Sequence, residues 1–393
     1  MKINIIHFSQ DFRKEKGQLG AFSRTFNLTK DGNHHLIFTI HFGDETISCF
    51  QIEHLKIISI GVGQQKFRSR FENSLSLFIG KRILSYISIN QIQVDMLFGH
   101  SQPVNFKILT YINQKLNKPL VWDANTIWGL PLFHNGPFLF RLYHFLYAQF
   151  AYRKCTYLIA QTEKSKQVFQ KYFGINDKKI SVITNSVNLE FFKKRKFYFQ
   201  GFSERRLNIY FVGLFDELNG IDFILDNIDR FDPSIIDLNF VGTGKRLDQI
   251  EKLQMDGKLT YHGVVPFNKM PDIFLSADLL LIPRIRCFGS DLFIPTKLLE
   301  GMASGLLVLG SDVGGISEVI RTDQNGFLFK AGDPNDLVDQ INHVISLDCV
   351  TLQKISDMAA MDIARLYNLK LNCHKLNSVY SEILTIENSL EKL

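Results

Sequence analysis

The residues best suited to chemistry lie in one stretch of the chain, at 293–320, which reads FIPTKLLEGMASGLLVLGSDVGGISEVI. Pro295 opens a predicted helix that carries Lys297 and Glu300, and a spacing of three residues places both side chains on one helix face near its N-terminal end. The free amides and the dipole of such an end favour an anion. A phosphorylated ligand is therefore expected here, with Glu300 able to accept hydrogen bonds from both hydroxyls of a ribose.

Glycine turns follow several predicted strands in the same half of the chain. The strand LLVLGSD is followed by Gly314 and Gly315, whose amides can approach a phosphate closely. Glu318 comes next, either as part of that site or as an early residue of a capped helix. Three further glycines follow predicted strands, namely Gly213 in FVGLFDELNG and both Gly242 and Gly244 in VGTG. Open α/β sheets bind ligands at the carboxyl ends of their strands, where these glycines are expected. Tight packing alone also accounts for many such glycine turns.

The elements that position these residues are short apolar runs alternating with helical patterns. Runs that are apolar on successive residues are typical of strands buried on both faces of a parallel sheet. This alternation of strand and helix patterns is interrupted by a basic, aromatic connector, residues 191–206, and then resumes. The pattern predicts an α/β fold with two Rossmann-like domains and a cleft between them, at 1–190 and 207–371, and a last helix of about 372–393 that packs back on the first domain. The connector is interpreted as a linker; its mixture of basic and aromatic residues also suits nucleic acid.

Charge is divided unevenly along the chain. Residues 1–195 contain 26 Lys and Arg against 12 Asp and Glu, a net charge of +14, whereas the remainder contains 19 against 27, a net charge of −8. The first half is therefore expected to meet an anionic partner, such as a membrane surface, a lipid phosphate or nucleic acid. With 26 Gly and 10 Pro and no biased tract, the composition excludes a disordered, collagen-like or coiled-coil protein. Five scattered cysteines fit a reducing cytoplasm, and neither a signal peptide nor a transmembrane helix is predicted.

The motifs of the second half together resemble a known family. P-x-K-x-x-E-x-M-A-x-G at 295–305, S-D-x-G-G-x-x-E at 311–318 and NGFLFKAGDP at 325–334 look like the nucleotide-sugar domain of family 4 glycosyltransferases. The resemblance extends upstream through HGVVP, VGTG, GLFDELNG and KKISVITNSVNLEFF. The first half is similar more loosely, through AFSRTFNLTKDGNHHLIFT, VDMLFGHS and PLVWDANTIWG.

The resemblance implies a retaining glycosyltransferase of the two-domain GT-B fold. Its donor would be a UDP- or GDP-sugar and its acceptor a hydroxyl of a glycan or of a polyprenyl-diphosphate-linked sugar, in the synthesis of a capsule, O-antigen or exopolysaccharide. In this family the leaving phosphate takes the acceptor proton, so no Asp or Glu is needed as a nucleophile. Transfer in the family proceeds without a bound metal and the chain has no HxH, HExxH or DxD triplet, so no metal and no cofactor is expected. The expected donor site comprises Gly213, Gly242, Gly244, Val264, Arg284, Asp291, Pro295, Lys297, Leu299, Glu300, Gly314, Gly315 and Glu318.

Two positions in the second half depart from the family pattern where the donor pyrophosphate should bind. Leu214 and Asn219 stand where the family usually has Arg and Lys. We expect Arg284, Arg286 and Lys297 on neighbouring strand ends to supply the missing charge. These departures also motivate an alternative, in which the chain has lost catalysis and serves as a binding or scaffold subunit.

Two further departures concern carboxylates and glycines. Leu292 stands where the family commonly has Glu, with Asp291 beside it as a candidate partner for the donor. The glycine loop that usually faces the donor phosphates from the first domain is reduced to Gly17 and Gly20.

Residues at strand ends of the first domain are the candidates for the acceptor side. His100 ends FGHS, and Asp123, Asn125 and Trp128 follow the next strand in WDANTIWG. We expect His100 and Asp123 to act with Glu300 as the catalytic residues, and Asn125 and Trp128 to contact the acceptor. A lone histidine at a strand end can instead be a hydrogen-bonded structural residue.

An aromatic stretch, FLFRLYHFLYAQFAY at 138–152, precedes Arg153 and Lys154. A helix of this kind can lie at a bilayer interface, and a buried core helix is the alternative. Basic clusters at 66–70 and 81–82 would add attraction to an anionic leaflet. We therefore expect a cytoplasmic protein in peripheral contact with the inner face of the cell membrane, without a nucleic-acid partner.

Overall fold

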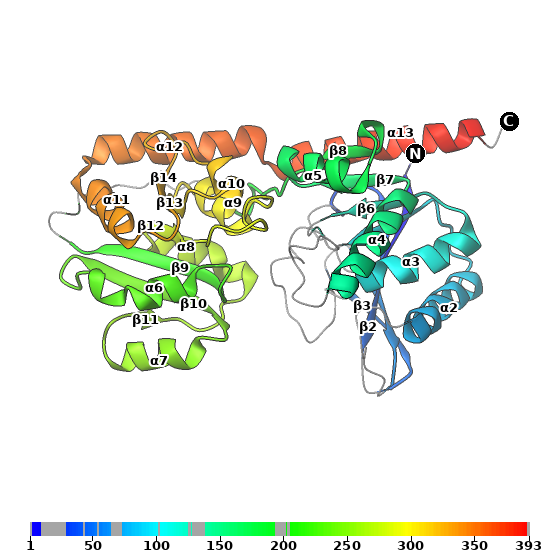
Figure 1. Ribbon diagram of the computed structural model, residues 1–393, viewed down its shortest axis with the longest axis horizontal. Helices are drawn as coiled ribbons and strands as arrows, with labels where there is room; N and C mark the ends of the chain where they lie inside the picture. Colours follow the sequence, from blue (N-terminus) through cyan, green and yellow to red (C-terminus); the bar gives the residue numbers. More distant parts are fainter. Residues whose placement is uncertain are drawn as a thin grey trace. The chain divides into compact units, whose positions relative to one another are not determined.

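The computed structural model describes residues 2–8, 29–41, 44–52, 55–63, 73–100, 103–124, 127, 138–192, 202 and 205–390. The chain divides into two compact units, Met1–Thr184 with Asn372–Leu393, and Asn185–Leu371 (Figure 1). Each unit holds one largely parallel sheet with helices packed against it, so the predicted α/β class is confirmed. Most of the connector, at 193–201, 203 and 204, lies outside the described residues.

Strands and helices alternate along the first unit. In chain order its elements are β1 (Asn4–Phe8), β2 (His34–His41), β3 (Ile47–Ile52), β4 (Leu55–Gly61), α2 (Asn73–Ile89), β5 (Met96–His100), α3 (Pro103–Leu116), β6 (Leu120–Asp123), α4 (Phe138–Lys154), β7 (Tyr157–Ala160), α5 (Glu163–Phe173), η4 (Asp177–Lys179), β8 (Ile180–Val182) and, at the end of the chain, α13 (Leu369–Leu390).

The sheet of the first unit has the strand order β3-β4-β2-β1-β5-β6-β7-β8. Its strands pair in parallel except β3 and β4, which are antiparallel and set Ile47 opposite Ile60. The antiparallel edge strand was not predicted, because most of β3 is exposed and it lacks the continuous apolar run that marks a buried strand. The chain order reverses between β1 and β5, and ligands of open α/β sheets bind at the carboxyl ends of two such strands.

The last helix, α13, covers one face of this sheet. Its Leu376, Tyr380 and Ile383 pack in one buried cluster with Ile5 of β1 and Phe98 of β5. Asn377 on the same helix donates to the main-chain oxygen of Asp31, which is 346 residues away in the sequence. The C-terminal segment is therefore part of the first unit, and α13 appears as the red helix in Figure 1.

The second unit repeats the alternation. Its elements are β9 (Leu207–Phe215), α6 (Ile221–Asp226), η5 (Ile228–Arg230), β10 (Ile236–Gly244), α7 (Leu247–Met255), β11 (Thr260–Tyr261), η6 (Phe267–Lys269), α8 (Met270–Ser276), β12 (Leu279–Ile282), α9 (Thr296–Ala303), β13 (Leu307–Ser311), α10 (Gly314–Ser317), β14 (Phe327–Phe329), α11 (Pro334–Ser346) and α12 (Cys349–Leu366).

The second sheet is parallel throughout, in the order β11-β10-β9-β12-β13-β14. Numbered within the unit this is 3-2-1-4-5-6, the order of a dinucleotide-binding fold, and it reverses between β9 and β12. At that switch point the segments that follow the two strands approach closely, since a Cβ on Gly220, at the start of α6, would lie 1.7 Å from the carbonyl oxygen of Pro283. The φ of Gly220 is +75°, so a glycine is required there on two grounds.

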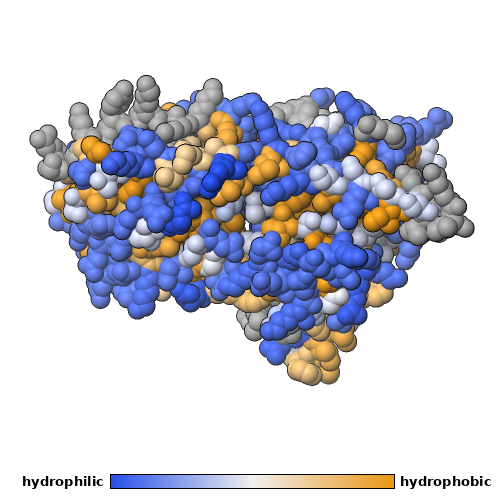
Figure 2. Space-filling view, turned by 90° about the horizontal axis from the view of Figure 1, so that it is seen from above, coloured by the Kyte–Doolittle hydropathy of each residue, from blue (hydrophilic) through white to orange (hydrophobic). Residues whose placement is uncertain are grey.

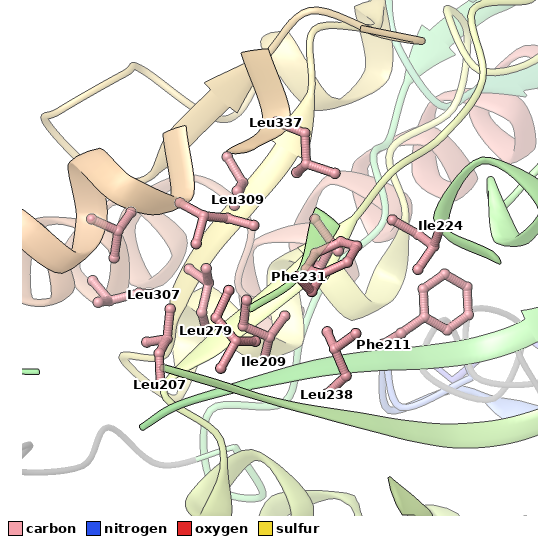
Figure 3. Close-up of a cluster of buried hydrophobic side chains, with 14 of the residues drawn as sticks. Leu207, Ile209, Phe211, Ile224, Phe231, Leu238, Leu279, Leu307, Leu309 and Leu337 are labelled. Carbon is pink, nitrogen blue, oxygen red and sulfur yellow. The ribbon is translucent and has the colours of Figure 1, made fainter. Parts of the chain in front are cut away.

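Both faces of the second sheet are buried in apolar cores. Alternate residues of β9 point to opposite sides, with Leu207 and Ile209 in one cluster and Tyr210 and Val212 in the other. Figure 3 shows part of the first cluster, in which side chains of β9 lie with leucines of β12 and β13. This burial explains why these strands read as continuous apolar runs in the sequence.

Among the described helices, none combines the length and the apolar character that a bilayer span requires.

Candidate functional site

Lys297 extends from α9 to the carboxyl end of β9. Its Nζ donates to the carbonyl oxygen of Val212 at 2.7 Å and to Oδ1 of Asn219 at 3.2 Å, and it lies 5.1 Å from the centre of the Phe211 ring. Gly213 leaves room for the ammonium, because a Cβ there would stand 3.0 Å from Nζ. The ammonium of Lys297 thus places a positive charge at the loop after β9, although the loop itself has the neutral Asn219.

Arg284 brings a second cation to the same switch point, just after β12. Its Nη1 donates to the carbonyl oxygen of Phe293 at 3.3 Å, and its buried Nε has no hydrogen-bond partner within the described part of the chain. Burial lowers the pKa of Arg284, while Cys287 and Asp216 oppose that shift. A buried guanidinium N–H without a partner is costly, so this group is suited to an anionic ligand.

Burial shifts the two titratable residues of α9 in opposite directions. Desolvation, and then repulsion from Arg284, lowers the pKa of Lys297 to about 7, against the opposing charges of Asp216 and Glu300. Burial raises the pKa of Glu300 to about 7, although the Lys297 cation pulls it down. Groups with such pKa shifts are enriched at functional sites, where a charged ligand favours one protonation state.

Pro295 and Leu299 frame these two residues on α9. Pro295 is the N-cap and has an extended ψ of 133°, so the helix begins at Thr296 and Lys297 falls in its first turn. Leu299 is fully buried in the apolar core, whereas Glu300 keeps 8% of its surface exposed.

Gly242 and Gly244 have a packing role at the edge of the sheet. Gly242 lies opposite Gly213 in the register, and a Cβ on Gly242 would lie 1.9 Å from the carbonyl oxygen of Gly213. A Cβ on Gly244 would lie 2.5 Å from the carbonyl oxygen of Phe215. These glycines therefore allow β9 and β10 to stay paired up to the switch point.

The amides of Gly314 and Gly315, expected to face a phosphate, have partners within the chain. Gly314 N–H donates to Oδ1 of Asp291 at 2.8 Å, and Gly315 N–H donates to the carbonyl oxygen of Ser290 at 3.1 Å. A Cβ on Gly315 would meet the carbonyl oxygen of Phe293 at 2.1 Å. In this structure the glycine pair therefore holds the loop before α9 against the start of α10.

The remaining predicted residues of this unit lie near its surface. Arg286 donates to Oδ1 of Asp312 at 2.6 Å and is exposed, so its charge is paired away from Lys297. Val264 is 57% exposed in the loop after β11. Glu318 is exposed at the C-cap of α10, and its N–H donates to the carbonyl oxygen of Gly314 at 3.0 Å.

In the first unit, His100 and Asp123 end two neighbouring strands and are both buried. Nδ1 of His100 lies 3.7 Å from Oδ2 of Asp123, and the two residues are paired in the sheet register. The main-chain oxygen of His100 accepts from Asn105 at 2.7 Å. The structure thus brings together two of the residues predicted for the acceptor side; Asn125, Trp128, Gly17, Gly20 and the basic cluster at 66–70 lie outside the described residues.

His100 continues into a buried row of polar side chains that sequence reasoning missed. His100 Nε2 lies 3.0 Å from His7 Nδ1, His7 Nε2 lies 2.8 Å from His35 Nδ1, and His35 Nε2 lies 2.8 Å from Asp31 Oδ1. The available signal was the presence of histidines in apolar strands, one in KINIIHF and two in HHLIFTI. We call this row, Asp31, His35, His7, His100 and Asp123, the histidine chain.

Two family models match the chain. The model described as "Glycosyl transferases group 1" matches residues 206–346, and the model described as "Glycosyltransferase Family 4" matches residues 27–191. The two matches fall on the second and the first unit respectively.

Curated relatives match over part of their length. A 41.2 kDa protein in the cps region of Klebsiella pneumoniae is 30% identical over 171 residues, which is 42% of this chain and 46% of the relative. An Escherichia coli UDP-Gal:alpha-D-GlcNAc-diphosphoundecaprenol alpha-1,3-galactosyltransferase is 24% identical over 256 residues, 60% of this chain and 62% of the relative. The chain spans about half the length of the first curated relatives it matches.

Solved structures match over almost the whole chain. A sucrose-phosphate synthase from Thermosynechococcus elongatus superimposes with a TM-score of 0.78 at 13% identity and covers 98% of this chain and 100% of that one. HepE from Anabaena, in complex with UDP and glucose, has a TM-score of 0.73 at 16% identity and covers 96% and 99%. These likenesses show the fold.

Proposed function

Because this chain belongs to the group 1 glycosyltransferases of family 4, with the GT-B fold, we propose that it is a retaining glycosyltransferase that moves a sugar from a nucleotide-diphosphate sugar to a hydroxyl group. The acceptor is a glycan or a lipid-linked sugar in cell-surface polysaccharide synthesis. The cps region named for the Klebsiella relative and the undecaprenol-linked acceptor named for the Escherichia coli relative support that choice.

One observation carries the proposal, namely the convergence of Lys297 and Arg284 on the switch point of the second sheet. Both cations are half-buried and lie near carboxyl strand ends, where phosphate-bearing ligands of such folds bind. Lys297 would supply the positive charge that the loop after β9 lacks because it has Asn219 in place of a basic residue. The UDP recorded in the structure of HepE suits a pyrophosphate at this edge.

Transfer of the sugar requires stabilisation of the negative charge on the leaving pyrophosphate more than it requires a strong base. The acceptor oxygen bonds to the anomeric carbon, the bond from that carbon to the phosphate oxygen breaks, and the acceptor proton goes to the leaving phosphate. Lys297 and Arg284 would neutralise the charge that grows on the departing pyrophosphate, which is the stabilisation that matters most in such a step. Glu300, once ionised, would hold the ribose hydroxyls, and His100 with Asp123 would orient the sugar or the acceptor.

Nucleotide binding tests the proposal. The unfolding temperature of the full chain is measured with UDP, GDP, ADP and CMP, and one of the diphosphates is expected to raise it. At a hundredfold excess over Kd the stabilisation is about 2.7 kcal/mol. If no nucleotide moves the transition, the scaffold alternative is favoured and the transferase proposal fails.

A membrane contact of the first unit is part of the proposal, and α4 supports it. One face of α4 exposes an apolar stripe: Phe138, Leu139, Leu142, Tyr143, Leu146 and Phe150. The other face of α4 buries Ala148, Ala151 and Tyr152. The helix is therefore packed on the unit by one face and is not a fully buried core helix. Arg153 and Lys154 are exposed at its end. Figure 2 shows hydrophobic residues gathered at the surface, including a projection at the lower edge of the view.

The charge of the first unit fits the same contact. Its two segments contain 25 Lys and Arg against 14 Asp and Glu, a net charge of +11, whereas the second unit has 20 against 25, a net charge of −5. Each basic residue near an anionic leaflet contributes about 1 kcal/mol. We therefore place the protein in the cytoplasm, at the inner face of the cell membrane.

Replacing both Leu139 and Leu146 by Ser is expected to weaken binding to vesicles that contain phosphatidylglycerol by at least about a hundredfold, since burying each leucine contributes about 1.5–3 kcal/mol. Vesicle sedimentation measures the effect. The control replaces Met255 and Met361, exposed methionines of the second unit, by Ser and should bind as the unchanged protein does. Equal partitioning of the leucine variant and the control would contradict the membrane role of α4, and equal binding to neutral vesicles would remove the electrostatic part.

A further inference from the structure

The loop after β9 contacts the ammonium of Lys297 through a short series of hydrogen bonds. Asn219 Oδ1 accepts from Lys297 Nζ at 3.2 Å, and Asn219 Nδ2 donates to Asp216 Oδ1 at 2.8 Å. The main-chain N–H of Asn219 donates to the same carboxylate oxygen at 2.9 Å. A carboxylate, a neutral amide and an ammonium thus follow one another at the carboxyl end of β9.

The two neighbours of the Asn219 amide determine its orientation. An ammonium only donates hydrogen bonds and a carboxylate only accepts them. The amide oxygen must therefore face Lys297 and the amide nitrogen must face Asp216, because the reversed amide would lose both bonds. With Asn219 at this position, the loop offers an acceptor for a cation that comes from another element.

Backbone contacts fix the turn that presents Asn219. Gly220 N–H donates to the carbonyl oxygen of Glu217 at 2.9 Å, which closes the turn. Gly220 also packs against the carbonyl group of Pro283, since a Cβ at residue 220 would lie 1.7 Å from that oxygen. Pro283 directly precedes Arg284, so the turn is held beside the segment that carries the second cation.

Lys297 has two anchors at this strand end. Among the described residues its ammonium has two hydrogen-bond acceptors, the carbonyl oxygen of Val212 at 2.7 Å and Oδ1 of Asn219. An ammonium has three N–H groups, so the third remains for an oxygen of a ligand. A lysine side chain loses considerable rotamer freedom when it is held in one place. A second anchor at Asn219 therefore orders the ammonium before a ligand arrives.

Asp216 also acts on both cations through its charge. Burial, and then repulsion from Arg284, lowers the pKa of Lys297 to about 7. The charge of Asp216, followed by that of Glu300, opposes this shift. Burial lowers the pKa of Arg284 as well, and Cys287 and then Asp216 oppose that change. One carboxylate thus favours the protonated forms of the two cations at the switch point.

We propose that Asp216 and Asn219 are positioning residues that act through Lys297. Asn219 fixes the ammonium at the end of β9, and Asp216 holds the amide of Asn219 in the orientation that accepts from it. The third N–H of Lys297 then points its charge at a phosphate oxygen of the donor, and this part of the inference rests on the proposed function. The loop after β9 thereby directs a cation that α9 supplies.

Carbon-13 NMR of the full chain with labelled lysine follows the charge of Lys297 without any nucleotide, so the result is independent of whether the chain transfers a sugar. The signal is assigned by its loss in Lys297→Met. Asp216→Asn keeps an acceptor oxygen for Asn219 but removes the charge, and it should lower the midpoint of the Lys297 titration by about one pH unit. Asn219→Ala removes the second anchor and should also lower the midpoint. Glu217→Gln, an exposed neighbour in the same loop, is the control and should leave it unchanged.

Calorimetric titration with the nucleoside diphosphate that raises the unfolding temperature separates positioning from a merely structural role. At pH 8, Asp216→Asn should bind about tenfold more weakly than the unchanged protein, because one pH unit in the titration of Lys297 changes its protonated fraction about tenfold. At pH 5.5 both proteins keep Lys297 charged and should bind alike. If no nucleotide binds, the proposed function fails, and the titration midpoint of Lys297 still tests the loop.

Two results would overturn the positioning roles. The first is a loss of affinity in Asp216→Asn that has the same size at pH 5.5 and at pH 8, since a merely structural defect does not depend on the charge of Lys297. The second is a Lys297 titration whose midpoint in Asp216→Asn and Asn219→Ala equals that in Glu217→Gln.

Discussion

Replacing Lys297 by Met is expected to lower kcat/KM for a nucleotide sugar by about 10²- to 10³-fold, the usual effect of removing one preorganised charge donor. The methionine keeps the length of the side chain but loses the ammonium that donates to Val212 and Asn219. Arg284 remains as the only other cation described at that strand end, so the departing pyrophosphate loses half of its neutralising charge. Steady-state kinetics with the donor identified by the nucleotide panel measure the change.

The stability of the same variant shows that the loss is functional. Because burial lowers the pKa of Lys297 to about 7, the folded protein binds a proton there less readily than the unfolded chain does. The contribution of Lys297 to stability therefore rises with pH above about 7 and is least favourable below it. At pH 6 the unfolding temperature of Lys297→Met should not fall. Lys258→Met, which removes an exposed lysine paired with Asp229, is the control and should keep its kcat/KM. An unchanged kcat/KM in Lys297→Met would remove Lys297 from the site.

Glu300→Gln is expected to weaken binding of the same nucleotide sugar by about 10- to 150-fold, since hydrogen bonds to a charged group contribute about 1.5–3 kcal/mol. It should also change the pH profile of the affinity. Binding needs Lys297 protonated and Glu300 ionised, and both have a pKa of about 7, so the affinity of the unchanged protein should be highest near pH 7. Calorimetric titration between pH 5.5 and 8.5 should show the acid limb disappear in Glu300→Gln and the alkaline limb in Lys297→Met.

Stability again supplies a separate check on Glu300. Its folded pKa is raised, so its favourable contribution is complete at low pH and is lost as the pH rises towards and past about 7. Glu300→Gln should therefore unfold at a higher temperature than the unchanged protein at pH 8 while it binds more weakly. Glu251→Gln, on the exposed face of α7, should change neither property. Equal affinities for Glu300→Gln and Glu251→Gln would contradict the ribose role.

The helix that carries the site could be predicted from the sequence, whereas the target of its lysine could not. Pro295, Lys297 and Glu300 follow one another at a spacing that indicates a shared helix face. The approach of Lys297 to Val212 depends on the 3-2-1-4-5-6 strand order and on the room left by Gly213. A contact between a helix residue and a strand residue 85 positions apart in the sequence leaves no local pattern.

For Gly314 and Gly315 the sequence indicated a position after a strand, but it did not determine what the two glycines do there. Gly314 and Gly315 were predicted to face a phosphate because of their place after a strand, and that role stays a prediction. In the structure their amides donate to Asp291 and Ser290, and the loop backbone leaves no room for a Cβ on Gly315. A glycine motif alone does not distinguish close packing from ligand approach, since both require the same absent side chain.

The histidine chain lay beyond single-sequence reasoning for a topological reason. His7, His35 and His100 come from three strands, and only the register of β2, β1 and β5 places their rings on one face. His100 could be singled out because it ends a strand. Its partners could not, because a histidine inside an apolar run reads as an ordinary core residue.

Sugar transfer itself is the most direct test of the central claim. The full chain is incubated with a panel of UDP- and GDP-sugars and polyprenyl-diphosphate-linked acceptors, and the products are measured by mass spectrometry. We predict that one donor yields an acceptor heavier by a single sugar residue, together with an equal amount of nucleoside diphosphate. If no donor yields either product although a nucleoside diphosphate raises the unfolding temperature, the chain is a binding subunit and the proposed transferase activity is wrong.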